Sequence, residues 1–348
     1  MSTDKRPTTL HDVARRAGVS IATVSKLLNQ QQRFTPKVEE RVLEAVQALS
    51  YRLNHAARSM VTGRTGTLGL AVLDISNPHF ASMVKGANRV ARMLGYTLMV
   101  MDLEECAGAE LQQLQALASR VDGLGVSARL PRQATQWLLQ QRQPTVWFGR
   151  FEQKGAAVVR TDGRVAGQLI GAHLLARGYR RVLYAGYEGS RWSADRADGL
   201  RATLSQAGRT LRLCEAPGPT IDGGRSAAAA WFEGRWRPDA VVGYNDMVAI
   251  GFMRELQRRG VRVPEEVGIA GIDNVPLCAL LEPELTSVDV RGMQQGESVI
   301  SELHGLIAAD IEPSVVVIEP QLVVRSSTPM RVRVGSSRAE PSRSVNRP

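Results

Sequence analysis

Residues 8–29 constrain this chain most strongly, because their pattern predicts two short helices joined by a tight turn. Thr9 is placed to cap the first helix, since its hydroxyl can accept a hydrogen bond from an unpaired backbone N–H of the first turn. Gly18 stands at the turn, where glycine adopts a positive φ without steric cost. The packing stripe of the first helix is formed by Val13, Ala14 and Ala17. Any two amphipathic helices can form such a hairpin, so a purely structural role stays open.

The second helix is expected to begin after a cap at Ser20 and to pack through Val24, Leu27 and Leu28. Its opposite face is small and mostly uncharged, as a helix that enters the major groove of DNA requires. This face carries Ile21, Ala22, Thr23, Ser25, Lys26 and Asn29. We therefore interpret the second helix as a candidate DNA-reading element. A third helix, capped by Thr35, is expected to pack through Val38, Val42, Leu43, Val46 and Leu49.

The charge of the chain is confined to its two ends. Residues 1–64 hold 11 Lys and Arg against 5 Asp and Glu, and residues 331–348 hold 5 against 1. Residues 65–330 hold 28 of each, so this long middle is neutral. A small basic segment beside a large neutral one is typical of a nucleic-acid reader with a separate core. A membrane-surface arm would need an aromatic or leucine-rich face, which the N-terminal helices lack.

These N-terminal residues resemble the headpiece and hinge of the lactose-repressor (LacI/GalR) family. The resemblance rests on residues 9–29, the helix 35–49 and the segments 51–54 (Tyr-Arg-Leu-Asn) and 57–60 (Ala-Arg-Ser-Met), and it continues to about Arg325. It implies that Ile21, Ala22 and Lys26 read bases, with Lys26 replacing a common Arg. It also implies that Met60 takes the place of a Leu that wedges into the minor groove. The other expected DNA contacts are Thr9, Ser20, Thr23, Ser25, Asn29, Asn54, His55 and Ala57.

The expected domain organisation follows from the same pattern. Residues 1–52 are predicted to form the headpiece, and residues 53–66 the hinge helix with its linker. Residues 54–61 hold too little apolar surface for an isolated helix, so we expect them to become helical only on DNA. The core is expected to cover 67–330, with an N-subdomain of about 67–161 and 291–319 and a C-subdomain of about 162–290 and 320–330. The Ser-, Arg- and Pro-rich residues 331–348 are expected to form a disordered basic tail.

From residue 68 the pattern becomes α/β. Ten short apolar runs predict strands, and most are continuous, as is typical of parallel strands buried on both faces. They cover 68–74, 96–102, 123–127, 145–148, 158–161, 181–185, 240–244, 267–272, 285–288 and 315–318. Helical stretches such as 80–94, 163–177 and 246–259 alternate with them, which predicts doubly wound parallel sheets. The resemblance implies an all-α helix-turn-helix headpiece plus a periplasmic-binding-protein-like core of two such subdomains, joined by three chain crossings.

Ligands of open α/β sheets bind beyond the carboxyl ends of the strands, so residues that follow strands are candidates. Motifs of the family match there: an NP-x-F turn, an R-x-x-G helix, an ND pair and a G-x-D turn. The resemblance implies contacts with a small-molecule effector from these motifs, and the expected set is His79, Phe80, Trp147, Arg196, Asn245 and Asp273. A planar guanidinium, amide and carboxylate acceptors and aromatic walls suit a polyhydroxylated ligand or a carboxylate.

Several of these residues also have a structural interpretation. Either Asn245 or Asp246 could cap the helix that follows, and for Asp246 we favour the cap. Asp273 could only fix a turn, and Phe80 is equally well a core residue.

For Arg196 the structural alternative is an ion pair with Asp195 or Asp198 on the same helix. For His79 it is a solvated position without a ligand.

One departure from the family bears on the ligand. Many sugar-binding relatives carry an Asp after the strand 145–148, where this chain has Gly149 followed by Arg150. Loss of an acceptor beside a cation favours a sugar acid or another anionic metabolite over a neutral monosaccharide.

Enzymatic and metal sites find little support. The core holds none of the patterns GxGxxG, GxxxxGK[ST], GxSxG or HExxH, so we expect no enzyme activity and no cofactor. The five histidines and the cysteines Cys106, Cys214 and Cys278 show no metal-ligand spacing. No apolar run reaches the roughly 18 residues of a membrane span, and the first residues lack a secretory signal. We therefore expect a cytoplasmic protein with reduced thiols.

The function that these patterns favour is transcription regulation. We expect a homodimeric repressor of a carbohydrate or sugar-acid utilisation operon, which binds a pseudo-palindromic double-stranded DNA operator under the control of a small polar metabolite. The alternatives are a periplasmic-type sugar-binding protein and a carbohydrate-active enzyme without DNA function.

Overall fold

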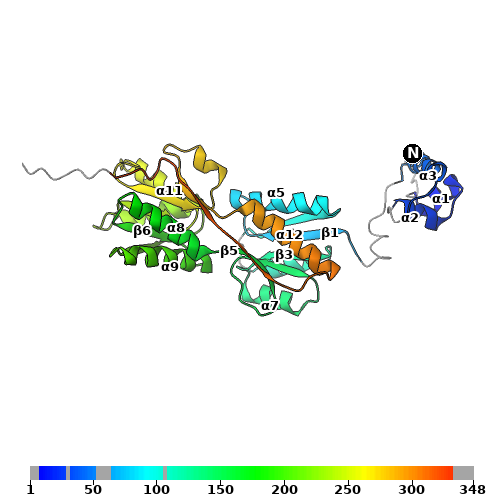
Figure 1. Cartoon of the computed structure of the whole chain (residues 1–348), viewed down its shortest axis with the longest axis horizontal. Coiled ribbons are helices and arrows are strands. Elements are labelled where there is room, and N and C mark those ends of the chain that lie inside the picture. The colour runs from blue at the N-terminus through cyan, green and yellow to red at the C-terminus, as the bar shows by residue number, and fades with distance from the viewer. Residues whose placement is uncertain (1–7, 29–31, 52–63, 105–107, 332–348) are drawn as a thin grey trace, which may run out of the picture. The chain divides into compact units, whose positions relative to one another are not determined.

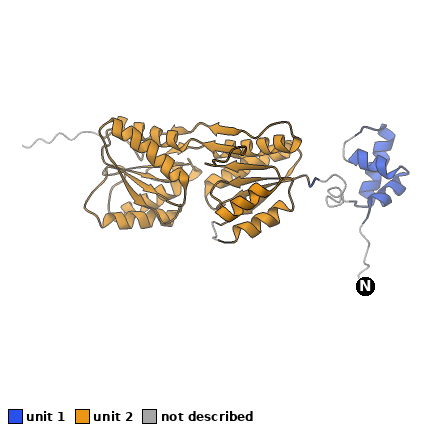
Figure 2. Ribbon diagram, turned by 90° about the horizontal axis from the view of Figure 1, so that it is seen from below, with its two compact units in different colours: residues 1–65 blue, residues 66–348 orange. Residues whose placement is uncertain are grey.

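The computed structural model describes residues 8–28, 32–51, 64–104 and 108–331. The chain divides into two compact units, Met1–Thr65 and Gly66–Pro348, which are coloured separately in Figure 2. The first unit is helical and the second is α/β. Among the described residues, no helix has both the length and the apolar composition needed to cross a bilayer. The predicted hinge helix 54–61, and residues 332–348 of the predicted tail, lie outside the described residues.

Helix α1 (Leu10–Ala17) begins and ends as its sequence predicts. The Thr9 hydroxyl accepts a hydrogen bond from the Asp12 backbone N–H at 3.3 Å, and the Asp12 carboxylate accepts one from the Thr9 N–H at 3.0 Å. This reciprocal pair satisfies two backbone donors that a helix start leaves unpaired. Gly18 then ends the helix with a φ of +62°.

Helices α2 (Ile21–Leu28) and α3 (Pro36–Ala48) complete the headpiece. The Ser20 hydroxyl caps α2 by accepting the Thr23 backbone N–H at 3.0 Å, as predicted. Thr35 occupies the N-cap position of α3, but its side chain makes no capping hydrogen bond.

The headpiece core is small and consists of short apolar side chains. Its buried members are Val13, Ala14, Ala17, Val24, Val42 and Ala45. Leu43 was predicted to pack inward, and this is wrong, because its side chain is 55% exposed. Ala45 contributes to the core instead, three residues after Val42 on the same face of α3.

The second unit contains two six-stranded sheets. The first has the strand order β11-β5-β4-β3-β1-β2 and is parallel throughout. Its strands are β1 (Thr67–Val72), β2 (Thr97–Asp102), β3 (Gly123–Ser127), β4 (Thr145–Phe148), β5 (Ala157–Thr161) and β11 (Val315–Ile318). The second sheet has the order β12-β10-β9-β8-β6-β7, and only β12 runs antiparallel, to β10. Its strands are β6 (Val182–Gly186), β7 (Leu211–Glu215), β8 (Ala240–Gly243), β9 (Gly268–Ile272), β10 (Thr286–Asp289) and β12 (Gln321–Val323).

All ten predicted strands are present, each within two residues of its predicted limits. The two strands that were not predicted are edge strands, β7 and β12. In β7 charged side chains interrupt the apolar ones, and β12 is only three residues long. An edge strand has one side free of neighbours, so it needs no continuous apolar run.

Helices cover both faces of each sheet, so both sheets are doubly wound as predicted (Figure 1). The first sheet carries α5 (Pro78–Met93) and α12 (Gly292–Ala308) on one face and α6 (Glu110–Ala118) and α7 (Arg132–Gln140) on the other. The second sheet carries the helix pairs α8 (Gly163–Ala176) with α9 (Arg191–Gln206) and α10 (Ile221–Phe232) with α11 (Asp246–Arg258). A 3-10 turn, η1 (Pro276–Ala279), follows β9. We call the halves built on the first and second sheets the N-subdomain and the C-subdomain.

The chain crosses between the two subdomains three times. It crosses after β5, returns after β10, and crosses again between β11 and β12. Figure 1 shows the last crossing as the long segment that runs from one sheet to the other. Two crossings are tied together, because the Thr161 hydroxyl donates to the Val290 carbonyl at 2.9 Å. The predicted fold class is therefore confirmed, including the number of crossings.

Helices α8 and α9 approach each other through glycine, which leads to a first prediction. A Cβ on Gly199 of α9 would collide with the Arg164 carbonyl of α8, so Gly199→Ala must push the helices apart. We expect a loss of about 2 kcal/mol in unfolding free energy. Urea unfolding of the full chain, followed by circular dichroism, measures it. The matched control is Gly218→Ala, where a Cβ would meet only the Thr220 hydroxyl at 3.8 Å. Equal losses in the two variants would contradict the packing account.

Candidate functional site

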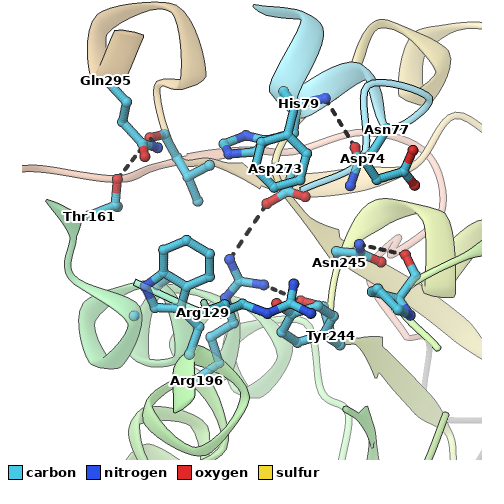
Figure 3. Close-up of a pocket in the computed structure, with 16 residues that line it drawn as sticks. Asp74, Asn77, His79, Arg129, Thr161, Arg196, Tyr244, Asn245, Asp273 and Gln295 are labelled. Atoms are coloured by element: carbon cyan, nitrogen blue, oxygen red, sulfur yellow. Dashed lines mark hydrogen bonds and ion pairs between the residues drawn. The ribbon is translucent and has the colours of Figure 1, made fainter. Parts of the chain in front are cut away.

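A cavity lies where strand ends of both sheets meet, between the N- and C-subdomains (Figure 3). Five of the six predicted effector residues line it, namely His79, Phe80, Arg196, Asn245 and Asp273. The cavity holds about 650 Å³ of space that no atom fills, part of which is open to solvent. Most of this space is too narrow for a water molecule, whose centre could move within only about 40 Å³. A sugar-sized ligand can therefore enter only if lining side chains or the subdomains move.

Arg196, on the second turn of α9, forms the polar centre of this cavity. Its Nη2 lies 3.5 Å from Oδ1 of Asp273, the contact that Figure 3 draws as a dashed line. Its Nη1 donates to the Tyr244 carbonyl, and the guanidinium lies over the Tyr244 ring, 4.9 Å from the ring centre. The Arg196 Nε is buried and has no hydrogen-bond partner within the described part of the chain. A buried donor of this kind calls for an acceptor from a ligand or from water.

The structural alternative for Arg196, an ion pair on its own helix, is wrong. Asp195 pairs with Arg150, and Asp198 pairs with Arg201 and Arg164.

Asp273 holds the opposite charge of the pair in an unusual turn. It directly follows β9 with a φ of +123°, and Asn274 follows with a φ of +52°. Two successive non-glycine residues in this region store strain, which concentrates at functional sites. The backbone N–H of Asp273 donates to the Val288 carbonyl at 2.8 Å, which anchors the turn to β10. Burial raises the pKa of the Asp273 carboxyl to about 7, although Arg196 acts in the opposite direction.

His79 and Phe80 reach the cavity from the first turn of α5. The side-chain carbonyl of Asn77 caps this helix by accepting the His79 backbone N–H at 3.0 Å. His79 is only 8% exposed, so its interpretation as a solvated bystander is wrong. Burial, reinforced by Arg196, lowers the pKa of His79 to about 4, and the ring is neutral at pH 7. The Phe80 ring contacts the His79 ring edge-on, with 5.1 Å between the ring centres. Phe80 belongs to the core of the N-subdomain and also lines the cavity.

Asn245, rather than Asp246, caps α11, so the favoured cap assignment is wrong. The Asn245 side-chain carbonyl accepts the Val248 backbone N–H at 2.9 Å, and its amide donates to the Pro219 carbonyl at 2.9 Å. Asp246 is fully buried and accepts a hydrogen bond from the Ser287 hydroxyl at 2.6 Å instead. Asn245 therefore combines a structural role with a place in the cavity lining.

Two expectations about residues 147–150 are corrected by the structure. Trp147 does not line the cavity; it packs in the core between the first sheet and its helices, stacked on Phe151 at 3.9 Å. Arg150 does not line the cavity either, because its guanidinium pairs with Asp195 and, at 2.8 Å, with Glu152. These two carboxylates neutralise the cation on which the expectation of an anionic ligand rested.

Other residues complete the lining, and they were not among the predicted site residues. They are Asp74, Asn77, Arg129, Thr161, Gly163, Ala166, Trp192, Pro219, Tyr244, Val290 and Gln295. Arg129 follows β3 and Thr161 ends β5, so the strand-end rule, applied to every strand, would have found both. Pro219 follows β7, which no apolar run signalled. Trp192 and Gln295 lie on helices, where no sequence pattern distinguishes them.

Helix α2 of the headpiece presents the small polar face that the sequence predicts. Ile21 is 46% exposed, Ala22 and Lys26 are also exposed, and Val24 is buried. Thr23 and Ser25 are half-buried at the edge of this face, and Thr9 and Ser20 are exposed. The other predicted DNA contacts, Asn29, Asn54, His55, Ala57 and Met60, lie outside the described residues.

Comparison with known proteins identifies the family. The sequence model described as bacterial regulatory proteins, lacI family, matches residues 9–54, and that of a periplasmic binding protein-like domain matches residues 172–328. The ribose operon repressor of Halalkalibacterium halodurans is 30% identical over 285 residues, which cover 81% of this chain and 85% of the relative. This chain belongs to the lacI family of bacterial regulatory proteins. The predicted class, a DNA-binding transcriptional regulator, is thereby confirmed.

Solved structures share the fold of this chain. The lac repressor dimer bound to operator and the anti-inducer ONPF shares the fold, with a TM-score of 0.82 at 24% identity, over 93% of this lacI-family chain and all of the other. The complex of the transcriptional regulator CelR with cellobiose is 28% identical, with a TM-score of 0.68, over 92% of this chain and all of the other.

The buried neutral His79 gives a second prediction. A folded pKa of about 4, below the unfolded value of roughly 6.5, means that its contribution to stability is full above pH 6.5 and is lost as the pH falls toward 4. Between pH 7 and pH 5 we expect the wild-type protein to lose roughly 2 kcal/mol relative to His79→Gln. Asp246 and Asp273 have raised pKa values, which make folding less favourable as the pH rises. Both proteins contain these two residues, so their effect cancels when the unfolding free energy of the variant is subtracted from that of the wild type.

Urea unfolding of both proteins at several pH values measures the His79 contribution. His11→Gln, on the exposed face of α1 in the other unit, serves as the control and should leave core unfolding unchanged. If the difference in unfolding free energy between the wild type and His79→Gln did not vary with pH, the burial of a neutral His79 ring would be contradicted.

Proposed function

We propose that this lacI-family protein is a homodimeric repressor of a sugar-utilisation operon, and that its effector is a neutral polyhydroxylated sugar bound between the subdomains. One observation carries the proposal: a single cavity brings together a guanidinium–carboxylate pair, neutral amide side chains and aromatic rings. Arg196, Asp273 and Asn245 supply directional hydrogen bonds, and Phe80 and Trp192 supply flat apolar walls. This combination suits a ring that is polar at its edge and apolar on its faces.

A neutral ligand is favoured over an anionic one by the charges of the lining. The lining holds two cations, Arg129 and Arg196, and two carboxyl groups, Asp74 and Asp273, and the buried His79 is neutral at pH 7. Since Arg150 is engaged by Asp195 and Glu152, it adds no further cation to hold a sugar acid. The relatives' names agree with this choice, since one is a ribose operon repressor and another was solved with cellobiose.

DNA recognition is proposed to use α2. Ile21, Ala22 and Lys26 lie on its exposed face and would reach base edges in the major groove. Polar residues at the edge of this face, and the segment around Met60, would contact phosphates and the minor groove. These supporting contacts are proposed for Thr9, Ser20, Thr23, Ser25, Asn29, Asn54, His55, Ala57 and Met60.

Dimer formation is supported by exposed apolar side chains in the core. β2 is an edge strand, with Val100 exposed on it and Met93 80% exposed on the neighbouring α5. In the C-subdomain, Leu277 and the 80% exposed Leu280 stand at η1. Exposed apolar groups along an edge strand mark a surface for pairing, here with a second copy of the chain. Such a dimer would present two headpieces to the two halves of a symmetric operator.

Control by the effector would work through the relative position of the subdomains. A ligand that contacts both of them favours one separation, and the hinge segments transmit that choice to the headpieces. The resulting coupling between sugar and DNA binding is expected to be about 1–3 kcal/mol, equal in both directions. The protein is proposed to act by binding alone, without catalysis.

Removing the central guanidinium tests the sugar site. Saturating sugar at about 100 times its dissociation constant should stabilise the wild type by roughly 2.7 kcal/mol, visible as a rise in Tm, and Arg196→Ala should abolish this rise. The ligands are D-ribose, D-glucose, cellobiose and D-gluconate, tested on the full chain. Arg201→Ala is the matched control, because Arg201 lies on the same helix, pairs with Asp198 and does not line the cavity. Stabilisation by D-gluconate alone, or by none of the four, would refute a neutral sugar effector.

Charge loss on α2 tests the DNA site. With an operator selected from random sequences, Lys26→Ala should lower the ratio of operator to random-DNA affinity by about tenfold, since a base contact is worth roughly 1–3 kcal/mol. Lys37→Ala on α3 removes the same charge and should leave that ratio unchanged. Band-shift titrations at fixed salt give both affinities. A Lys26→Ala protein that discriminates as well as the wild type would exclude Lys26 from base reading.

A further inference from the structure

Trp192 touches both subdomains. It stands in the first turn of α9, in the C-subdomain, and its ring lies against Gly149, which directly follows β4 in the N-subdomain. A Cβ placed on Gly149 would lie 2.5 Å from Cζ2 of the indole, closer than real Cβ atoms come to any neighbour. Gly149 also has a φ of +106°, and its N–H donates to the Val159 carbonyl at 2.9 Å, which holds it in the first sheet. The indole therefore fills the space that any side chain at position 149 would need.

An ion pair crosses the same gap beside the indole. Arg150, the next residue of the N-subdomain, pairs with Asp195, one turn after Trp192 on α9. Glu152 holds the Arg150 guanidinium from the other side at 2.8 Å. Two adjacent residues after β4 thus contact a single turn of α9, one by packing and one by charge.

The same indole also forms a wall of the cavity. Trp192 lines it together with Arg196, which stands four residues later on the same face of α9. A ligand held by Arg196 must therefore lie beside the indole. A change in the angle between the subdomains would therefore move the indole relative to Gly149.

We propose that Trp192 is a strut that holds the two subdomains at a fixed separation along this side of the cavity and sets the size of ligand that the cavity accepts. The second half of this inference rests on the proposed sugar-binding function, whereas the first half does not. Many sugar-binding relatives carry an Asp at the position of Gly149. In this chain the indole of Trp192 occupies the space that such a side chain would need. Trp192 acts here as a specificity-determining residue.

A double-substitution cycle tests the strut without any ligand. Gly149→Ala should lower the Tm of the full chain by at least about 3 °C more than Gly155→Ala, a matched change in the same loop. Gly155 also has a positive φ, of +78°, but a Cβ there would meet nothing within 4 Å. In the Trp192→Ala background the excess should shrink, because the ring that causes the clash is absent and only the backbone strain of the φ of +106° remains. An excess of unchanged size in this background would overturn the strut.

Two sugars test the control of ligand size. Removal of the indole should increase the stabilisation by cellobiose relative to D-ribose, with the ratio of apparent affinities rising at least tenfold in Trp192→Ala. If the ratio of affinities were the same with and without the indole, Trp192 would not determine the accepted ligand size. The same conclusion would follow if neither sugar bound to either protein. Failure of the proposed function would appear separately, as an operator affinity that responds to no sugar while the ligand-free cycle still succeeds.

Discussion

The buried ion pair between Arg196 and Asp273 is the interaction on which the rest of the site depends. Taking two charges out of water is costly, and a buried pair persists only when further contacts compensate it. Here the Tyr244 carbonyl and ring satisfy part of the guanidinium, while hydrogen bonding to β10 fixes the strained turn that carries Asp273. Burial keeps His79 neutral, and the positive charge of Arg196 acts in the same direction.

This pair also positions α9 relative to the second sheet. Since Arg196 is held against the ends of β8 and β9, the turn of α9 that precedes it is directed toward the N-subdomain. That turn carries Trp192 and Asp195, which contact Gly149 and Arg150. The cavity lining and the contact between the subdomains therefore share one helical segment. The two contacts are joined by a helix and not by a loop.

Local features of this structure could be predicted from the sequence, and features that depend on distant partners could not. Thr9, Gly18 and Ser20 act on their immediate neighbours, so their roles follow from helix chemistry alone. The continuous apolar runs of inner strands are equally local, whereas β7 and β12 lack such a run because they lie at sheet edges. Leu43 was misplaced because a helix of 13 residues offers more apolar side chains than its small partner surface can cover.

The residues around the cavity also divide into those that local sequence patterns predict and those that depend on distant partners. Strand ends identified Asn245 and Asp273, because the geometry of parallel sheets applies to every member of the class. The places of Trp147 and Arg150 depended on which face of β4 the helices cover and on which carboxylates lie opposite, and the sequence records neither. Trp192 was missed for the same reason, since only its neighbour across the gap distinguishes it from other helical tryptophans.

The position of Trp192 also has an optical consequence. The chain holds five tryptophans, Trp137, Trp147, Trp192, Trp231 and Trp236, all of them described and all in the second unit. Trp192 alone among them lines the cavity. The tryptophan emission of this protein therefore comes from the second unit alone and not from the headpiece. The other four indoles do not line the cavity, so a ligand bound there would contact only one of the five tryptophans, and Trp192 serves as a built-in fluorescent label of the site.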